Sequence, residues 1–194
     1  MPSKIDIISN ASILIGHTSI SSLDPDQGAA ATVGAALFDT TLEYMLATTY
    51  WRFSMKQQQL NRLTAAPLNN WQYAFQLPTD MVTLYRTEPR SSYQIFEDLL
   101  YTNSSELAAD YSFKPEAEAL PVYFVQAMQY KLAADFAIAI TNDTQKNGLY
   151  ENKYRQELKI AMAADAKNHP PVTIQDQPFT DVRLSGFDFL GGNS

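Results

Sequence analysis

Cysteine is absent from the 194 residues, and the chain has only two histidines, His17 and His169. Without cysteine there is no disulfide, no thiolate metal ligand and no cysteine nucleophile. A histidine-based metal site needs clustered His and carboxylate ligands, but the two histidines fall in separate expected loops. A serine triad would have to recruit one of the same histidines, and no Gly-x-Ser-x-Gly motif is present. We therefore expect no metal and no catalytic residues.

Glycine and long apolar runs are also scarce. Among the seven glycines, Gly16 and Gly34 stand alone rather than in a P-loop or a dinucleotide-binding fingerprint. No stretch approaches the roughly 18 apolar residues of a membrane span, and the N-terminus lacks the basic and then apolar segments of a signal peptide. We expect no cofactor and no membrane anchor, and synthesis in a cytoplasm.

Charged residues make up 18% of the chain, below the roughly 25% of typical soluble domains. Neutral polar residues fill the gap, and such a surface suits large assembly contacts because burying it forfeits no ion solvation. The net charge is −7, with 21 acidic and 14 basic residues, the reverse of the basic footprint that phosphate binding requires. An acidic surface can face DNA without holding it, since like charges repel across a Debye length of about 8 Å.

Four segments have the apolar spacing of amphipathic helices. Ser3 can cap the first helix and Gly16 is placed to end it, while Pro121 suits the first turn of the third. Small alanines late in the fourth segment allow close helix contact. The expected helices span residues 4–15, 26–49, 121–141 and 144–168.

Between the second and third helices the hydrophobic period changes from helical to two. Trp51, Phe53 and Met55 alternate with polar residues, as in a half-buried strand. A second alternating run at residues 71–77 stops at Pro78. Further strands are expected at residues 82–87, 93–97, 99–102 and 110–113.

Helical character ends at Pro170 and Pro171, because two consecutive prolines cannot continue a helix. The residues beyond are too apolar to be left in water, so we expect an arm that docks on another protein surface. The expected binding residues are Val172, Ile174, Phe179, Val182, Leu184, Phe187, Phe189 and Leu190.

This order predicts an α+β fold in which an antiparallel helical bundle of about four helices carries an inserted antiparallel β lobe and an extended C-terminal arm. Residues 1–50 and 120–168 should form the bundle, residues 51–119 the β lobe and residues 169–194 the arm. Antiparallel helices must bury facing apolar stripes, so the first 50 residues should pack on those after 120.

Several segments carry a resemblance to a known family over roughly residues 4–168. In the first half they are Ile15-Gly16, Ile20-Ser21-Ser22-Leu23-Asp24, then Tyr50-Trp51-Arg52-Phe53-Ser54 at the end of an alanine-rich helix, and Leu60 soon afterwards. An aromatic strand follows, Trp71-Gln72-Tyr73-Ala74-Phe75, and continues into Gln76-Leu77-Pro78-Thr79-Asp80. The last two segments are Leu120-Pro121-Val122-Tyr123-Phe124 and Leu132-Ala133-Ala134-Asp135. With these landmarks the chain resembles the tail tubular protein A family of short-tailed bacteriophage adaptors.

The resemblance implies a non-catalytic virion protein, a head-to-tail adaptor in the neck region of the viral tail. It implies a dodecameric ring of this chain that connects the portal protein to the tail nozzle protein, tail tubular protein B, with tail fibres as a further candidate partner. The helical bundle would face the portal and the β lobe the nozzle. In such a ring we expect the arm at residues 169–194 to dock on the portal or a neighbouring subunit. DNA would pass through the ring during ejection without specific binding.

Two other functions stay open on the residues alone. A phage-associated cell-wall hydrolase would use paired carboxylates, and Asp39 with Glu43, or Asp24 with Asp26, have a suitable spacing. A charged helix face explains the same spacing, whereas a cleft holding one carboxyl of raised pKa would favour the hydrolase. A freestanding regulatory interaction module is the third function.

Basic residues gather on the fourth expected helix. Lys146, Lys153, Arg155 and Lys159 lie there, interrupted by Glu151 and Glu157. This mixture predicts a solvated or intersubunit face rather than a track for DNA.

Overall fold

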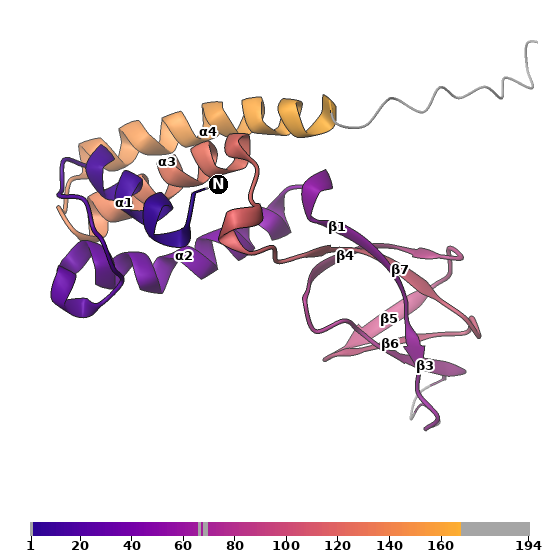
Figure 1. Cartoon of the computed structure of the whole chain (residues 1–194). Coiled ribbons are helices and arrows are strands. Elements are labelled where there is room, and N and C mark those ends of the chain that lie inside the picture. Colours follow the sequence, from indigo (N-terminus) through magenta and orange to yellow (C-terminus); the bar gives the residue numbers. More distant parts are fainter. Residues whose placement is uncertain (1, 66, 68–69, 168–194) are drawn as a thin grey trace, which may run out of the picture.

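The computed structural model describes residues 2–65, 67 and 70–167. Within these residues the chain forms four α-helices and seven β-strands, and the strands make two antiparallel sheets (Figure 1). The α+β class expected from the sequence is therefore confirmed. The expected arm at residues 169–194, with its binding residues from Val172 to Leu190, lies outside the described residues.

The first helix has the local signals that the sequence indicated. The Ser3 hydroxyl accepts the backbone N–H of Asp6, whose carboxylate accepts the N–H of Ser3 in return, which makes a capping box. Gly16 follows the helix with φ +87°, a conformation that favours glycine. The four helices are α1 (Lys4–Leu14), α2 (Ala29–Thr48), α3 (Val122–Ala139) and α4 (Thr144–Lys167).

The start of α2 differs from the expectation. Residues Pro25–Gln27 form a short 3₁₀ helix, and Gly28 adopts φ +97° before α2 begins at Ala29. The α-helix expected from residue 26 was therefore placed three residues too early. Pro25 at the first position of the 3₁₀ turn and the turn at Gly28 set a separate element there.

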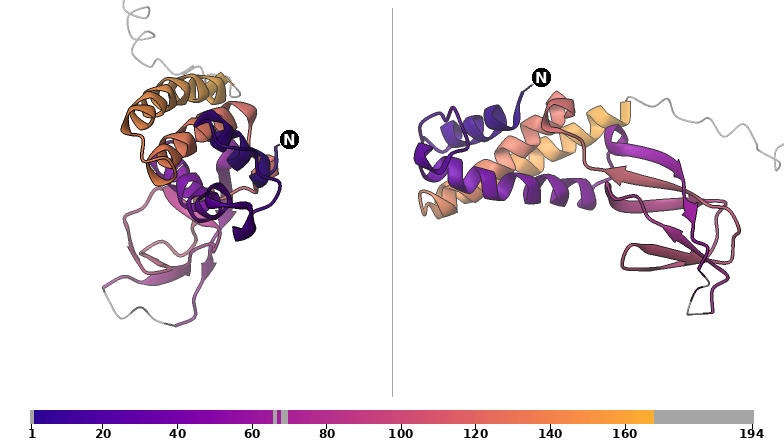
Figure 2. Two further views of the ribbon diagram at one scale, coloured as in Figure 1. Left: turned by 90° about the vertical axis from the view of Figure 1, so that its left-hand side faces the viewer. Right: turned by 60° about the horizontal axis from the view of Figure 1, so that its bottom comes forward.

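Apolar residues from all four helices share one buried cluster. Helix α3 contacts each of the other three helices, and it carries buried Phe124, Met128, Leu132 and Phe136 (Figure 2). Segments from the two ends of the described chain therefore lie side by side. Each large apolar side chain that is fully buried contributes about 1.5–3 kcal/mol through the hydrophobic effect.

Helices α1 and α2 approach each other closely at Gly34. A Cβ atom built on Gly34 would lie 2.2 Å from Cγ2 of Ile8, a fully buried side chain of α1. Ile8 is β-branched and stiff at χ1, so it cannot turn away cheaply. Glycine at position 34 thus sets the spacing of these two helices.

The strands form two small sheets. The first has the order β1 (Met55–Gln59), β7 (Ala108–Phe113) and β4 (Met81–Glu88). The second has the order β2 (Asn61–Arg62), β3 (Tyr73–Gln76), β6 (Leu99–Thr102) and β5 (Tyr93–Phe96). Only Leu60 separates β1 from β2, so the chain passes directly from one sheet to the other.

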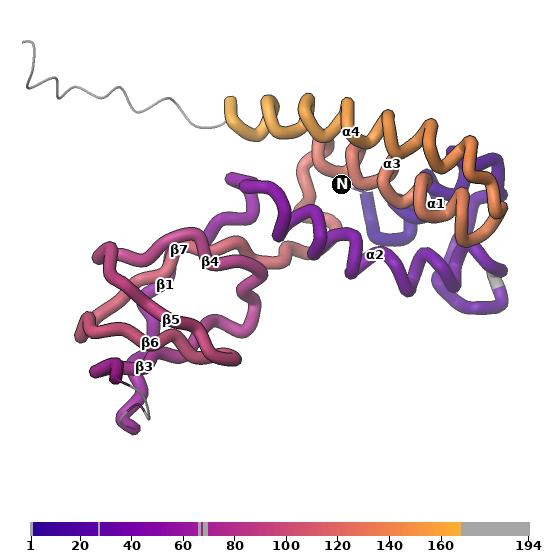
Figure 3. The backbone as a smooth tube through the Cα atoms, turned by 180° about the vertical axis from the view of Figure 1, so that it is seen from behind, coloured from indigo at the N-terminus to yellow at the C-terminus, as the bar shows by residue number. Residues whose placement is uncertain are grey.

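A second apolar cluster lies among the strands and joins both sheets. Its buried members are Leu60, Phe75, Leu77, Leu100, Leu107, Ala109 and Tyr111. Phe75 on β3 is the register partner of Leu100 on β6, while Ala109 and Tyr111 come from the other sheet. In Figures 1 and 3 the strands lie beyond one end of the helices. The chain enters the strands after α2 and returns to the helices after β7.

The strand expected at Trp51 was wrong. Residues Arg52–Ser54 form a 3₁₀ turn, and β1 begins only at Met55. Trp51 is fully buried in the helical cluster, where its indole N–H donates to the carbonyl of Met45 at 2.9 Å. Its ring also meets Phe124 edge-on, with the centroids 5.0 Å apart. Packing against the helices, rather than strand alternation, determines this position.

Most other strand boundaries shifted by one or two residues. The run expected at residues 71–77 pairs only over Tyr73–Gln76, and the strand expected from Asp110 begins at Ala108. The two-residue strand β2 was not predicted at all. These shifts arise because pairing depends on partners that are distant in the sequence.

Candidate interaction surfaces

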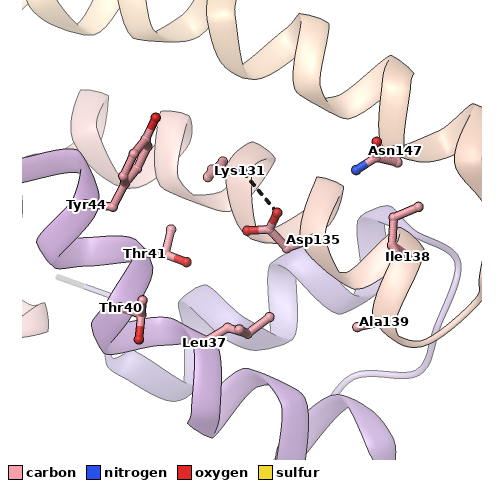
Figure 4. Close-up of a pocket in the computed structure, with 9 residues that line it drawn as sticks. All are labelled: Leu37, Thr40, Thr41, Tyr44, Lys131, Asp135, Ile138, Ala139 and Asn147. Carbon is pink, nitrogen blue, oxygen red and sulfur yellow. Dashed lines mark hydrogen bonds and ion pairs between the residues drawn. The ribbon is translucent and has the colours of Figure 1, made fainter. Parts of the chain in front are cut away.

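One groove lies between α2, α3 and the start of α4, with a volume of about 540 Å³ (Figure 4). Its lining is mostly apolar, but Lys131 and Asp135 lie along one side. The ammonium of Lys131 is 3.0 Å from the Asp135 carboxylate and 3.6 Å from that of Glu151 on α4. The remaining lining residues are Leu37, Thr40, Thr41, Tyr44, Ile138, Ala139 and Asn147.

Electrostatics at this first groove do not favour a nucleophile. Burial by itself would lower the pKa of Lys131, but the hydrogen bond with Asp135 and the charges of Asp135 and Glu151 raise it above its usual value. Burial also raises the pKa of nearby Tyr154 to about 12. Both groups stay protonated at neutral pH, so neither is suited to take a proton from a substrate.

A second groove, of about 410 Å³, is formed by Lys4 at the start of α1, by α2 and by the segment that leads to α3. We call it the acidic groove, because carboxylates outnumber ammonium groups there. Its lining residues are Lys4, Phe38, Asp39, Leu42, Lys114, Pro115, Glu116, Ala117 and Glu118, with Glu43 beside them.

Asp39 is the centre of an ion-pair network in the acidic groove. Lys4 and Lys114 approach its two carboxylate oxygens at 2.7 and 2.8 Å, and Lys114 also reaches Glu43 at 2.9 Å. Hydrogen bonds from Lys114 and then Lys4 lower the pKa of Asp39 below its usual value. A general acid needs the opposite shift, and the two carboxylates instead form ion pairs with Lys4 and Lys114.

The other carboxylates around these helices have different surroundings. Asp24 and Asp26 are exposed at the turn before α2, where Asp24 accepts a hydrogen bond from Ser22. Glu116 and Glu118 are exposed at the rim of the acidic groove, and neither pairs with a cation within the described part of the chain. Uncompensated negative charge therefore remains at this rim.

The basic residues expected to cluster on the fourth helix separate into two groups. Lys146 points toward α1, where its ammonium donates to the carbonyl of Ile15 at 2.9 Å and so satisfies the end of that helix. The outer group is exposed, together with apolar side chains at helical spacing. We call it the basic face of α4, and it consists of Leu149, Lys153, Arg155, Lys159, Ile160, Met162 and Lys167.

The sequence places two glutamates among these basic residues, and the structure leaves them less exposed than the cations of the basic face of α4. Glu151 is half-buried and directed to Lys131 on α3, and Glu157 is half-buried as well. Arg155 makes a 3.6 Å contact with Glu151 but keeps 68% of its side chain exposed. The exposed charges of α4 are consequently all positive.

Asp165 near the end of α4 is a buried charged group at the junction between helices and sheets. Only 3% of the residue is exposed. Its carboxylate accepts the backbone N–H of Arg52 at 2.6 Å and the hydroxyl of Tyr123 at 2.8 Å. Asp165 thus joins α4 to the turn before β1 and to α3. An acidic residue on an otherwise apolar helix stripe was the only signal for this role in the sequence.

Neither a metal centre nor a membrane helix is found in the described ranges. No group of three or more potential metal ligands occurs among residues 2–65, 67 and 70–167. His17 is exposed in a loop, and His169 lies outside these ranges. Within the same ranges, no helix combines the length and apolarity needed to span a bilayer.

Comparisons with known proteins gave no assignment. The chain matches no protein-family model, and no curated protein matches its sequence.

Proposed function

We propose that this chain is a non-catalytic structural subunit, a head-to-tail adaptor that forms a ring of about twelve copies between a phage portal and a tail nozzle. The observation that carries the proposal is the position of the family landmarks within the fold. Trp51 closes the helical core before β1, Pro78 lies between β3 and β4, and Pro121 directly precedes α3. Trp51 and Pro121 therefore occupy joints between helices and sheets and Pro78 a joint between the two sheets, where a shared architecture would require them.

The surfaces of the molecule are compatible with an assembly subunit. Apolar side chains remain exposed on several elements, including Leu149 and Ile160 on α4 and Ile95 and Phe96 on the edge strand β5. Exposed apolar groups at protein surfaces often mark contacts with other proteins. The net charge of −7 suits a ring through which DNA passes without being bound.

Truncation tests the arm in this proposal. A chain that stops before Pro170 should keep its folded core, because the described residues up to Lys167 already supply a buried cluster from all four helices. It should fail to bind the portal, since the lost arm residues would bury apolar area worth roughly 25 cal/mol per Å². Circular dichroism and co-purification with the portal, with the full chain as control, measure both properties. Portal binding by the truncated chain would remove the arm from the mechanism.

A particle-level experiment tests the whole proposal. Electron microscopy of the virion that contains this chain should show a ring of it between portal and nozzle. A different location would reject the adaptor function. Zymography on cell-wall substrate addresses the hydrolase alternative, and clearing that is lost in Asp39→Asn would replace the structural proposal with an enzymatic one.

A further inference from the structure

We propose that the basic face of α4 on one copy binds the acidic groove of the next copy, so that subunits join head to tail. This contact rests on the proposed ring and specifies the two surfaces that make it. Its occupant is a second copy of the same chain. The argument uses charge, exposure and the positions of both surfaces on the helices.

The basic face of α4 carries charge that the subunit does not neutralise. Among the described residues, neither Lys159 nor Lys167 pairs with a carboxylate. Lys153 lies over the rings of Tyr130 and Tyr150, at 5.6 and 5.8 Å from their centroids, and has no ion-pair partner there either. A concentration of free positive charge is unusual on a chain whose net charge is −7.

Apolar side chains lie between these cations. Leu149, Ile160 and Met162 are 51%, 60% and 45% exposed. Lys153, Ile160 and Lys167 follow one another at seven-residue intervals, which places them along one line of the helix. Such a surface, with apolar groups between charges of one sign, is typical of a protein contact, and its cations require carboxylates on the partner.

The acidic groove offers the opposite charges. Phe38 and Leu42 in its lining are only 2% and 1% exposed, so the surface open to a partner is mainly that of the exposed residues Glu116 and Glu118. The two lysines of the groove are already engaged by Asp39 and Glu43, so Glu116 and Glu118 remain to meet incoming cations. A helix that carries exposed lysine side chains therefore matches this groove in charge.

The two surfaces lie on different sides of the helices. Seen along the helices in Figure 2, α4 and the N-terminal end of α1 lie on different sides of α3. One copy cannot bring its own α4 into its own groove without unfolding. Contact between two different surfaces is heterologous, and repetition of such a contact closes a ring when the rotation between copies permits it.

Charge reversal at each surface provides the test. Lys159→Glu with Lys167→Glu makes the α4 surface acidic, and Glu116→Lys with Glu118→Lys makes the groove rim basic. Each double variant alone should associate roughly a hundredfold more weakly than the wild type, because like charges then face each other. An equimolar mixture should recover assembly, since each copy finds a complementary neighbour. Sedimentation and mass measurement over a concentration series report these outcomes.

A matched control reverses two exposed cations of the β lobe. Arg62→Glu with Arg90→Glu makes the same change in net charge as the α4 variant, and it should leave assembly unchanged. Circular dichroism establishes that each variant is folded.

Introduced cysteines give a second measurement, because the chain has none of its own. Lys159→Cys on one copy and Glu118→Cys on another should form a disulfide between copies on oxidation.

Three results would overturn this contact: a wild-type chain that stays monomeric at the highest concentration, full assembly of either double variant alone, or no recovery in the mixture. The proposed function can fail separately. Rings that tolerate both reversals and still bind the portal would reject only this contact. Chains that assemble through these surfaces but never bind the portal would reject only the adaptor function.

Discussion

At the scale of single residues, Asp165 holds together three parts of the chain. Replacement by alanine would leave the backbone N–H of Arg52 and the hydroxyl of Tyr123 without their acceptor in a buried region. We expect Asp165→Ala to lower the free energy of unfolding by about 2–4 kcal/mol. Urea denaturation measures the loss.

Tyr123→Phe provides the comparison for Asp165, since it removes only the hydroxyl donor and should cost about 1 kcal/mol. A double variant with Asp165→Ala should then lose less than the sum of the two single losses, because the residues share one network. Additive losses would mean that the hydrogen bond between them contributes nothing.

Asp39 links stability to acid pH. Its pKa in the folded chain lies below the usual value of 3.8, so it stabilises the fold fully above pH 3.8, and this contribution is lost as the pH falls through the lowered pKa. Because the pairs are half-exposed, Asp39→Asn should cost only about 0.5–1 kcal/mol at pH 7. The difference between variant and wild type should vanish near the acid limit. A difference that persists at pH 2 would contradict the ionic explanation.

At the scale of elements, the contact between α1 and α2 depends on Gly34. Alanine is the better helix former by about 1 kcal/mol, yet its Cβ would collide with Ile8. We expect Gly34→Ala to lower the free energy of unfolding by about 1–3 kcal/mol. Gly148→Ala on α4 is the matched control, because nothing lies within 4 Å of its added Cβ. It should stabilise the chain by about 0.5–1 kcal/mol, and equal effects of the two changes would contradict the packing argument.

The helices could be predicted because their signals are local. Ser3, Gly16 and Pro121 mark ends that the structure places within a residue or two. The strand predicted at Trp51 was wrong because Trp51, Phe53 and Met55 alternate as in a strand, whereas the structure buries Trp51 against α3. The cations of α4 were recognised, but not their orientation. Which side of α4 faces inward depends on α3, and so neither the separate role of Lys146 nor the inward position of Glu151 could be inferred from spacing.

At the scale of the whole molecule, the strands are an insertion in the helical part, and the segments where the chain enters and leaves this insertion, β1 and β7, pair with each other. Met55 at the start of β1 and Ser112 near the end of β7 are register partners, so the entry and exit of the strands lie only about 5 Å apart. Replacing residues 55–113 with a short glycine-serine linker should therefore leave the four helices folded. Loss of the packing of Val82 and Tyr85 should cost about 1–3 kcal/mol.

Thermal unfolding followed by circular dichroism tests this replacement. We expect the chain with the linker to show a cooperative transition in its helical signal. If it melts without cooperativity, the sheets are needed for the helical core. A chain with the same linker and with Trp51→Ala should unfold at a markedly lower temperature than the chain with the linker alone, because that change removes a large, fully buried side chain, at a cost of about 3–5 kcal/mol.

A core assembled from both ends of the described chain also sets the order of events during synthesis. Helices α1 and α2 leave the ribosome about 70 residues before α3, an interval of roughly 4–14 s at the usual rates of translation. During that interval α1 and α2 can pack on each other but lack α3, the helix that contacts both. The sheet of β2, β3, β6 and β5 can already pair, whereas β1 and β4 must wait for their shared partner β7, which ends at Phe113 shortly before α3 begins at Val122. The nascent chain thus passes through a stage with a completed sheet region and an unfinished helical one, and in that stage it is most exposed to aggregation and most in need of a chaperone.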